Sequence, residues 1–180
     1  MPTLAPTTAG LPLRTAMERR DLAAVMDAFT PDAVLHSPLT EKLAFRGREE
    51  IGVLTTVLFD AFEEFHYTDE MRTADAAFLV ARARIGGEDI EMVDQIRLAP
   101  DGRISEQTVF FRPLPATAAA LRVLGAGLGS RRGRVRGAII SGLTRPLGLM
   151  TRAGDRIGVR LIRPALQARL PVGTGTRRSK

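Results

Sequence analysis

The sequence of 180 residues contains no cysteine and only two histidines, His36 and His66. The absence of cysteine excludes disulfides, thiolate metal sites and cysteine nucleophiles, and it fits a reducing compartment. Two histidines are too few for a zinc enzyme that relies on several histidine ligands. We therefore expect no metal site, and the sequence contains no cofactor-binding motif that we recognise.

Long apolar runs and a secretory signal are also lacking. No stretch reaches the roughly 18 uninterrupted apolar residues that a membrane-spanning helix needs. Residues 1–10 are small, polar and proline-bearing, without the basic cluster and apolar run of a signal peptide. The hydrophobic content of 44% is nevertheless enough for a packed core. We expect a soluble, cytoplasmic protein.

Acidic residues are scarce in one part of the chain. Residues 1–112 carry 12 Lys and Arg against 19 Asp and Glu, a net charge of −7. Residues 113–180 carry 14 Lys and Arg and a single acid, Asp155, a net charge of +13. Such asymmetry indicates parts with different roles. We predict a disordered tail over 1–11, a folded domain over 12–113, a basic helical extension over 114–170 and a disordered tail over 171–180.

The first half of the predicted domain favours helices. One helix is expected to begin at Pro12, a favoured residue in a first turn. A short helix over 22–29 follows the N-cap residue Asp21. A short strand over 33–37 and a loop lead to a third helix, which begins near Glu49 and ends near residue 62 with an apolar face at helical spacing.

The second half of the predicted domain favours strands, over 65–73, 78–85, 90–98 and 103–112. Gly86-Gly87 predicts a tight hairpin turn between the second and third of them. Helices followed by a run of strands indicate an α+β fold. We predict that the helices pack on one face of a curved antiparallel sheet. Its concave face must be filled by side chains or by a ligand.

Asp94 breaks the alternation of the predicted strand 90–98. It falls on the apolar face, between Met92 and Ile96, where burial without a partner is costly. In one interpretation its pKa is raised, and the neutral acid donates a hydrogen bond to a ligand oxygen. In the other, Asp94 pairs with a buried arginine, Arg82 or Arg84, and only holds the sheet together. Both interpretations stay open.

His36 and Ser37 precede Pro38, and alternation sends one inward and the other outward. An inward His36 could act as a general base, whereas an inward Ser37 would be a small polar group near the mouth of a pocket. The last strand has two faces, and the sequence does not settle which one lines the interior. We assign Asp94 and His36 as catalytic candidates. The candidate ligand contacts are Ser37, Met92, Gln107, Val109, Phe111, Phe59 and Met17, of which Phe59 suits an ordinary core position better than a ligand contact.

The order of several short segments resembles the SnoaL-like branch of the nuclear transport factor 2-like superfamily, over about residues 12–113. The segments are Asp21–Met26, Thr30–Pro38, Phe45–Ile51, Asp101–Ile104 and Phe111–Pro113. The resemblance implies an α+β cone, that is, a cone-shaped, cystatin-like roll, and a homodimer formed through the sheet. It also implies a pocket for a small apolar molecule of polyketide, steroid or terpenoid type, and an isomerase, cyclase or hydrolase activity on a substrate that stays open.

The superfamily includes ketosteroid isomerase, which holds a protonated aspartic acid in an oxyanion hole. By similarity, Asp94 falls at the position of that aspartate. Ser37 occupies the place of the catalytic base, and Leu13 occupies the place of the oxyanion tyrosine. The His-Asp pair that many SnoaL-like sequences carry before this proline is His36-Ser37 here.

The basic extension predicts a helix over 116–128 and then an amphipathic pattern over 140–163. Its arginines on the polar side are Arg145, Arg152, Arg156, Arg160 and Arg163. The apolar side could pack on the cone or on a dimer partner, or it could lie on an anionic membrane surface with the arginines at the head groups. The extension has no aromatic residue for base stacking and no recognised DNA-binding motif, which argues against nucleic acid.

Two functions from different classes follow. In the first, the protein binds a small apolar molecule in its cone, and whether it is an enzyme stays open. In the second, it is a non-enzymatic adaptor whose cone is filled by its own side chains and whose basic extension binds a membrane surface or a partner. The two differ in whether an open pocket reaches Asp94.

Overall fold

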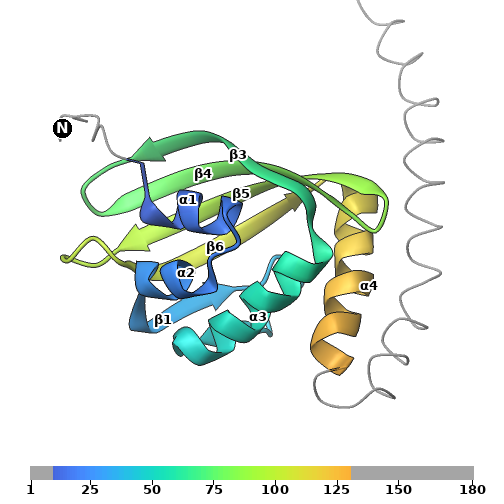
Figure 1. Ribbon diagram of the computed structural model, residues 1–180, viewed down its shortest axis with the longest axis horizontal. Coiled ribbons are helices and arrows are strands. Elements are labelled where there is room, and N and C mark those ends of the chain that lie inside the picture. Colours follow the sequence, from blue (N-terminus) through green and yellow to red (C-terminus); the bar gives the residue numbers. More distant parts are fainter. Residues whose placement is uncertain (1–9, 131–180) are drawn as a thin grey trace, which may run out of the picture.

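The structure is a computed structural model that describes residues 10–130 as an α+β fold (Figure 1). Residues 1–9 of the tail predicted over 1–11 lie outside the described residues, as do the predicted tail over 171–180 and the amphipathic part of the extension. The same holds for its five arginines, Arg145, Arg152, Arg156, Arg160 and Arg163.

Six strands form one sheet in the order β2-β1-β6-β5-β4-β3. Their bounds are β1 Phe29–His36, β2 Ala44–Arg46, β3 Glu63–Arg72, β4 Ala76–Ile85, β5 Glu88–Leu98 and β6 Ile104–Arg112. The four predicted strands of the second half are confirmed as β3 to β6. The short strand β2, which pairs with β1, lies in a segment that the sequence analysis treats as loop.

The sheet is mixed, which corrects one part of the prediction. All neighbouring strands are antiparallel except β1 and β6, which are parallel. Parallel neighbours require a crossover connection. After β1 and β2 the chain crosses through helix α3 (Gly47–Ala61) to the far edge of the sheet, and the successive strands β3 to β6 then lead it back beside β1.

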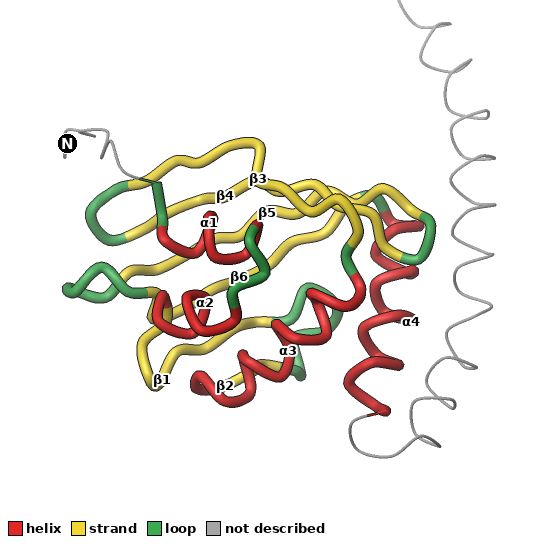
Figure 2. Tube along the Cα trace, viewed as in Figure 1, coloured by secondary structure: helices red, strands yellow, loops and turns green. Residues whose placement is uncertain are grey.

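Three helices lie on the concave face of the sheet, and a fourth stands at one end of it (Figure 1, Figure 2). They are α1 Pro12–Glu18, α2 Leu22–Ala28, α3 and α4 Leu114–Ser130. The N-cap prediction for α2 is confirmed, because the Asp21 side chain accepts a hydrogen bond from the Ala24 N–H at 3.0 Å. The fold class is therefore the predicted one, helices packed on a curved sheet.

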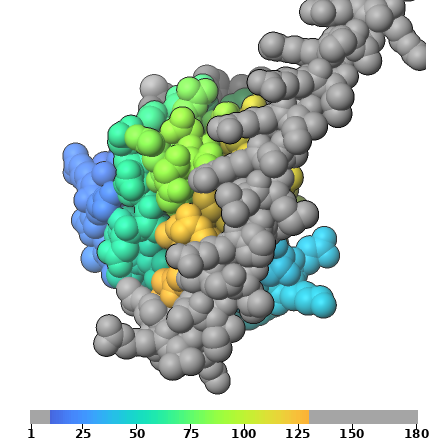
Figure 3. Space-filling model, turned by 90° about the vertical axis from the view of Figure 1, so that its right-hand side faces the viewer, coloured from blue at the N-terminus to red at the C-terminus, as the bar shows by residue number. Residues whose placement is uncertain are grey.

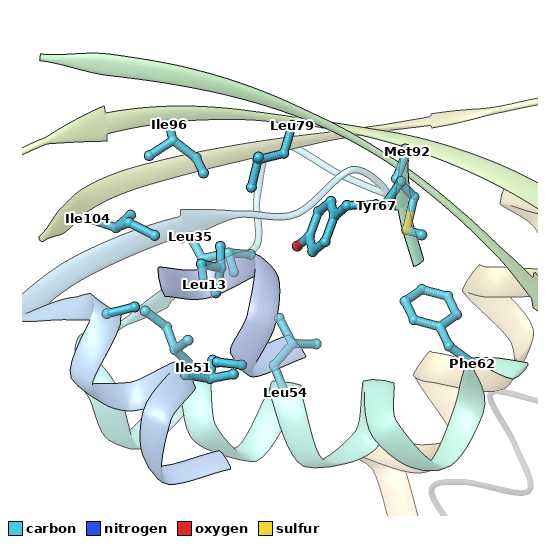
Figure 4. Close-up of a cluster of buried hydrophobic side chains, with 14 of the residues drawn as sticks. Leu13, Leu35, Ile51, Leu54, Phe62, Tyr67, Leu79, Met92, Ile96 and Ile104 are labelled. Carbon is cyan, nitrogen blue, oxygen red and sulfur yellow. The ribbon is translucent and has the colours of Figure 1, made fainter. Parts of the chain in front are cut away.

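The core lies between the sheet and the helices α1 and α3, as the buried side chains in Figure 4 show. Leu11 belongs to it, with 2% of its surface exposed. Its backbone N–H donates to Glu70 Oε1 at 2.8 Å. Leu11 was predicted to lie in the disordered tail, and this is corrected: an isolated leucine beside Pro12 carries no periodic signal, so only the tertiary contacts place it.

Helix α4 is part of the same folded unit, although the sequence analysis places its residues in a separate extension. It packs against α3 and the strands β4, β5 and β6. Gly86, in the β4–β5 hairpin, has a φ of +57°, and a Cβ there would lie 2.7 Å from the Arg122 side chain. Figure 3 shows α4, in orange, at the surface beside this green hairpin. None of the described helices is long and apolar enough to cross a membrane.

Candidate functional site

A cavity of about 160 Å³ opens inside the cone. A single water molecule needs only about 10–15 Å³, so the cavity has room for a small organic molecule. Its walls come from α1, β1, β2, α3, β3, β5, β6, α4 and the loop over 37–43. The apolar lining includes Leu13, Met17, Leu35, Phe45, Leu54, Phe62, Phe65, Met92, Val109, Phe111, Leu121, Leu124 and Leu128. Figure 4 shows Leu54 and Phe62 on the helical side facing Tyr67 and Met92 on the sheet side.

Asp94 lies in this lining, on the inner face of β5, with 6% of its surface exposed. Burial raises the pKa of its carboxyl to about 6, and hydrogen bonds from Gln107 and Tyr67 limit the rise. Burial removes water from the charged form and so favours the protonated acid, whereas hydrogen-bond donors favour the carboxylate. The carboxyl therefore changes charge slightly below neutral pH, at the wall of an apolar cavity.

Among residues 10–130, no arginine pairs with Asp94, which corrects one of the two interpretations of this residue. Arg82 and Arg84 occupy alternate positions on β4 and lie on the exposed face of the sheet. The Nε atom of Arg84 is 3.4 Å from Asp89 Oδ1. The partner of Asp94 in the sheet register is Leu79, which faces inward. Side chains along β4 alternate between the inner and outer faces of the sheet, and Arg82 and Arg84 both occupy outer positions. Neither arginine can therefore reach Asp94 on the inner face.

Tyr67 is the partner that the sequence analysis did not assign. Its hydroxyl donates to Asp94 Oδ2 at 3.3 Å, and the side chain is buried. Burial, together with the nearby Asp94, raises the pKa of the Tyr67 hydroxyl well above its usual value, so this hydroxyl stays protonated. The signal in the sequence is the i, i+2 spacing of Phe65 and Tyr67, which places two aromatic rings on one face of a strand.

Two charged side chains of α1 hold the backbone of Tyr67. The Arg14 Nη2 donates to the Tyr67 carbonyl at 3.0 Å, and the Tyr67 N–H donates to Glu18 Oε1 at 2.9 Å. Because β3 is an edge strand, these two backbone groups have no strand beside them to pair with. Helix α1 therefore fixes the strand at the residue whose hydroxyl meets Asp94.

The inner face of β6 is now identified. Gln107, Val109 and Phe111 line the cavity, whereas Phe110 on the other face is 52% exposed. The Gln107 side chain is 6% exposed and bonds to Asp94, and its Oε1 is buried without a hydrogen-bond partner. Gln107 thus bonds to Asp94 and also has a side-chain oxygen that accepts no hydrogen bond.

His36 and Phe59 lie outside this cavity. The His36 Nε2 is 2.9 Å from Glu106 Oε1, and Arg97 Nε is 3.3 Å from the other oxygen of that carboxylate. Alternation sends Leu35 and Ser37 inward and His36 to the opposite face, so His36 cannot reach a molecule in the cavity. Phe59 borders a separate, smaller hollow beside Arg20. The other predicted contacts, Ser37, Met92 and Met17, line the main cavity.

Helix α4 supplies a wall that sequence reasoning placed outside the domain. Leu121, Leu124, Gly125 and Leu128 face the cavity. The leucines recur at steps of three and four, which is the spacing of one helical face. That signal was available, but it does not say what the face packs against. Within residues 10–130, no group of three or more His, Asp or Glu side chains is arranged to hold a metal ion.

The comparison with protein families agrees with this architecture. Residues 13–107 match the SnoaL-like domain, which is more than half of the chain. The protein belongs to the SnoaL-like domain family, within the nuclear transport factor 2-like superfamily. The resemblance stated from the sequence is confirmed. A search among curated proteins found no match.

Several solved structures are similar. A steroid delta-isomerase from Pseudomonas aeruginosa is 28% identical, with a TM-score of 0.56, over 66% of this chain and 84% of that one. An uncharacterised bacterial protein with a cystatin-like fold from Silicibacter pomeroyi is 20% identical, with a TM-score of 0.59, over 67% and 82%. A hypothetical protein with a ketosteroid isomerase-like fold from Catenulispora acidiphila, in complex with trimethylamine, is 18% identical, with a TM-score of 0.51, over 63% and 92%. The last two comparisons concern the fold alone.

Proposed function

We propose that this protein binds a small, mainly apolar molecule of polyketide, steroid or terpenoid type in the cavity, with Asp94 as the polar contact. The observation that carries the proposal is an apolar cavity that reaches a buried carboxyl, for which the described residues provide no cationic partner. An unfilled cavity and a buried acid each cost folding free energy. A ligand that fills the first and bonds to the second would offset both costs.

A proton-transfer reaction of the isomerase type is the activity that the site supports best. A group with a pKa of about 6 can both accept and donate a proton near neutral pH. The similarity to the steroid delta-isomerase of Pseudomonas aeruginosa supports the same class. Asp94 would be the catalytic residue, and Tyr67 and Gln107 would stabilise its carboxylate form.

Steroid isomerisation with the base and the oxyanion tyrosine of ketosteroid isomerase has less support. Leu13 and Ser37 line the cavity at the places where the resemblance puts the oxyanion tyrosine and the base. A leucine can neither donate nor accept a hydrogen bond, and a serine hydroxyl is a weak base. Asp94 is therefore the one carboxyl among the described lining residues that can move a proton, and the reaction proposed here passes through it.

The competing function, an adaptor with a filled cone, has less support for a related reason. It requires the side chains of the protein to occupy the concave face of the sheet. The cavity at Asp94 supports a binding function instead. The basic extension beyond residue 130 contributes nothing to this choice, since it lies outside the described residues.

The test is native mass spectrometry of the purified full-length protein, followed by binding and turnover measurements with the molecule that co-purifies. Turnover of unsaturated ketones to conjugated enones can be followed by ultraviolet absorbance as a general isomerase assay. We expect Asp94→Asn to abolish turnover and to weaken binding by about tenfold or more, because a hydrogen bond to a charged group is lost.

The matched control is Asp60→Asn, which removes an exposed carboxyl of α3 outside the cavity. It should leave binding and turnover unchanged. If Asp94→Asn binds and converts the ligand as the wild type does, the proposal is wrong. If nothing co-purifies and no compound of the three classes binds, the cavity is not a ligand site.

A further inference from the structure

The cavity is small for a ligand site. Its volume is about 160 Å³. An apolar cavity of about 150 Å³ in another protein binds benzene, a molecule with a single ring. Pockets that bury drug-sized molecules have volumes of roughly 300–1,000 Å³. The space beside Asp94 therefore matches one ring with short substituents and is too small for several fused rings.

Packed side chains bound the cavity on the side of the sheet. Met92 and Asp94 border it from β5. The next inward residues of this strand on either side, Ile90 and Ile96, are 2% and 0% exposed and belong to the core. Leu79, the partner of Asp94 in the register, is also 0% exposed. In Figure 4, Leu79 and Ile96 lie together, apart from Met92. The cavity therefore ends at Asp94 in one direction along β5 and at Met92 in the other.

Packed side chains also bound the cavity on the side of the helices. Leu54 borders it from α3, and Ile51, one turn earlier in that helix, is 0% exposed. Leu124 borders it from α4, and Ala120, one turn earlier, is 0% exposed. Protein interiors are close-packed, so a larger molecule could enter this region only by displacing core side chains, which costs free energy.

The outer side of the cavity lies at the loop over 37–43. Thr40 and Leu43 belong to the lining and are exposed, Leu43 with 41% of its surface. A molecule longer than the cavity would leave its further rings at this loop, in contact with water. Apolar surface that stays in water contributes no binding free energy. Additional rings would therefore gain nothing there.

We infer that the ligand has a single ring and on the order of ten non-hydrogen atoms, as in a cyclic monoterpenoid or a monocyclic aromatic compound. Phe111, which contributes an aromatic ring to the wall, is a specificity-determining residue for ligand size. The inference rests on the proposed function and deepens it, because it selects small single-ring molecules over steroids and polyketides with several fused rings.

The test uses three phenols that differ in size: thymol with one ring, 4-phenylphenol with two and estradiol with four. All of them present a phenol group, so the polar end is matched. Equilibrium dialysis of each compound against the full-length protein gives its affinity. We expect thymol to bind about tenfold or more tightly than estradiol, because estradiol must displace packed side chains. Non-specific apolar binding would give the opposite order, since estradiol has more apolar surface.

Phe111→Ala removes one aromatic ring from the wall of the cavity. Phe111 is only partly buried, so we expect the variant to fold. The second ring of 4-phenylphenol can take the vacated space, and the affinity for this compound should rise about tenfold relative to that for thymol. The matched control is Phe110→Ala, the same substitution one residue earlier, on the opposite face of β6, where the side chain is 52% exposed. It should leave the order of affinities unchanged.

The size of any molecule that co-purifies in native mass spectrometry is a second criterion: a single-ring molecule supports the inference, and a molecule with four fused rings overturns it. The inference also fails, while the proposed binding function stands, if estradiol binds as tightly as thymol or if Phe111→Ala leaves the relative affinities unchanged. If none of the three phenols binds and no molecule co-purifies with the wild type, the inference and the proposed function fail together.

Discussion

The burial of Asp94 costs folding free energy, and Asp94 is also the residue proposed to contact the ligand. It is buried beside Met92 and Leu79, and its nearest polar partners, Tyr67 and Gln107, are neutral. Neutral donors offset only part of the cost of burying a carboxylate. The residue therefore lowers the stability of the folded protein at neutral pH, which is expected of a group that is retained for binding or catalysis.

The stability of the wild type relative to Asp94→Asn should depend on pH. The pKa of Asp94 is raised from 3.8 to about 6, so the folded state holds its proton over a pH range in which the unfolded state has lost it. Its stabilising contribution is complete below pH 3.8 and is lost as pH rises through 6. The free energy of unfolding of the wild type should fall relative to the variant by up to about 3 kcal/mol.

Urea unfolding of both proteins at pH 4, 5, 6 and 7.5, followed by circular dichroism, measures this difference. Asp60→Asn controls for the loss of one charge at an exposed position. A difference between the wild type and Asp94→Asn that stays constant over this range would contradict the raised pKa.

At the scale of elements, the packing of α4 against α3 decides whether the cavity is closed. Gly127 of α4 faces Val57 of α3, and a Cβ at Gly127 would lie 2.6 Å from Val57 Cγ1. Val57 is buried, so it has little room to move. The absence of a side chain at Gly127 thus sets how closely the two helices approach, and it places Leu124 and Leu128 against the cavity.

Gly127→Ala should therefore destabilise the protein by about 1–3 kcal/mol through overpacking, partly offset by roughly 1 kcal/mol from the better helix propensity of alanine. In a Val57→Ala background the methyl group has space, and the same substitution should be neutral or stabilising. A double-mutant cycle from urea unfolding measures the coupling. Additive effects of the two substitutions would show that the helices do not meet at this pair.

At the scale of the whole molecule, the two faces of the sheet differ in what covers them. The concave face and α4 enclose the cavity, and the described residues that line it lie between positions 13 and 128. The outer face of the sheet carries an apolar row, because Val80 pairs with Val93 and Val93 pairs with Phe110 in the register. Exposed apolar sheet surface of this kind suits an interface between protein copies.

The extent of the functional unit can be tested by truncation. A chain ending at residue 130 should fold and bind the same ligand as the full-length protein, since it keeps all the lining residues found within the described part of the chain. A chain ending at residue 113 loses buried side chains of α4, including Ala116, Ala120 and Leu124, and should be strongly destabilised. Thermal unfolding and native mass spectrometry measure both. Ligand binding by the chain ending at residue 113 would contradict the role of α4.

The homodimer that the resemblance implies is proposed to form through the outer face of the sheet. Phe110→Glu places a charge in the apolar row and should convert a dimer to a monomer in analytical ultracentrifugation. Leu114→Glu is the control, because Leu114 is 66% exposed but lies outside the sheet. A wild type that is monomeric, or a Phe110→Glu variant that remains dimeric, would rule out this interface.

The sequence by itself determined the helices and strands, and it singled out Asp94 as a polar residue on an apolar strand face. Strand alternation placed Asp94 on an apolar face, helical spacing predicted α3, and Gly86-Gly87 marked the hairpin. These signals are local, because they depend on the geometry of one element and on which of its side chains avoid water. They were sufficient to predict an α+β fold and to identify Asp94 as the candidate polar contact, whereas the cone came from the family resemblance.

Only the tertiary structure decided what each face meets. The periodicity of β6 is the same whichever face turns inward, and the leucines of α4 form an apolar stripe without naming the surface that covers it. Tyr67 and Asp94 are 27 residues apart in the chain, and they meet because β3 and β5 flank β4 in the sheet. Contacts between elements depend on strand order and packing, which involve residues far apart in the chain, and no local pattern contains them.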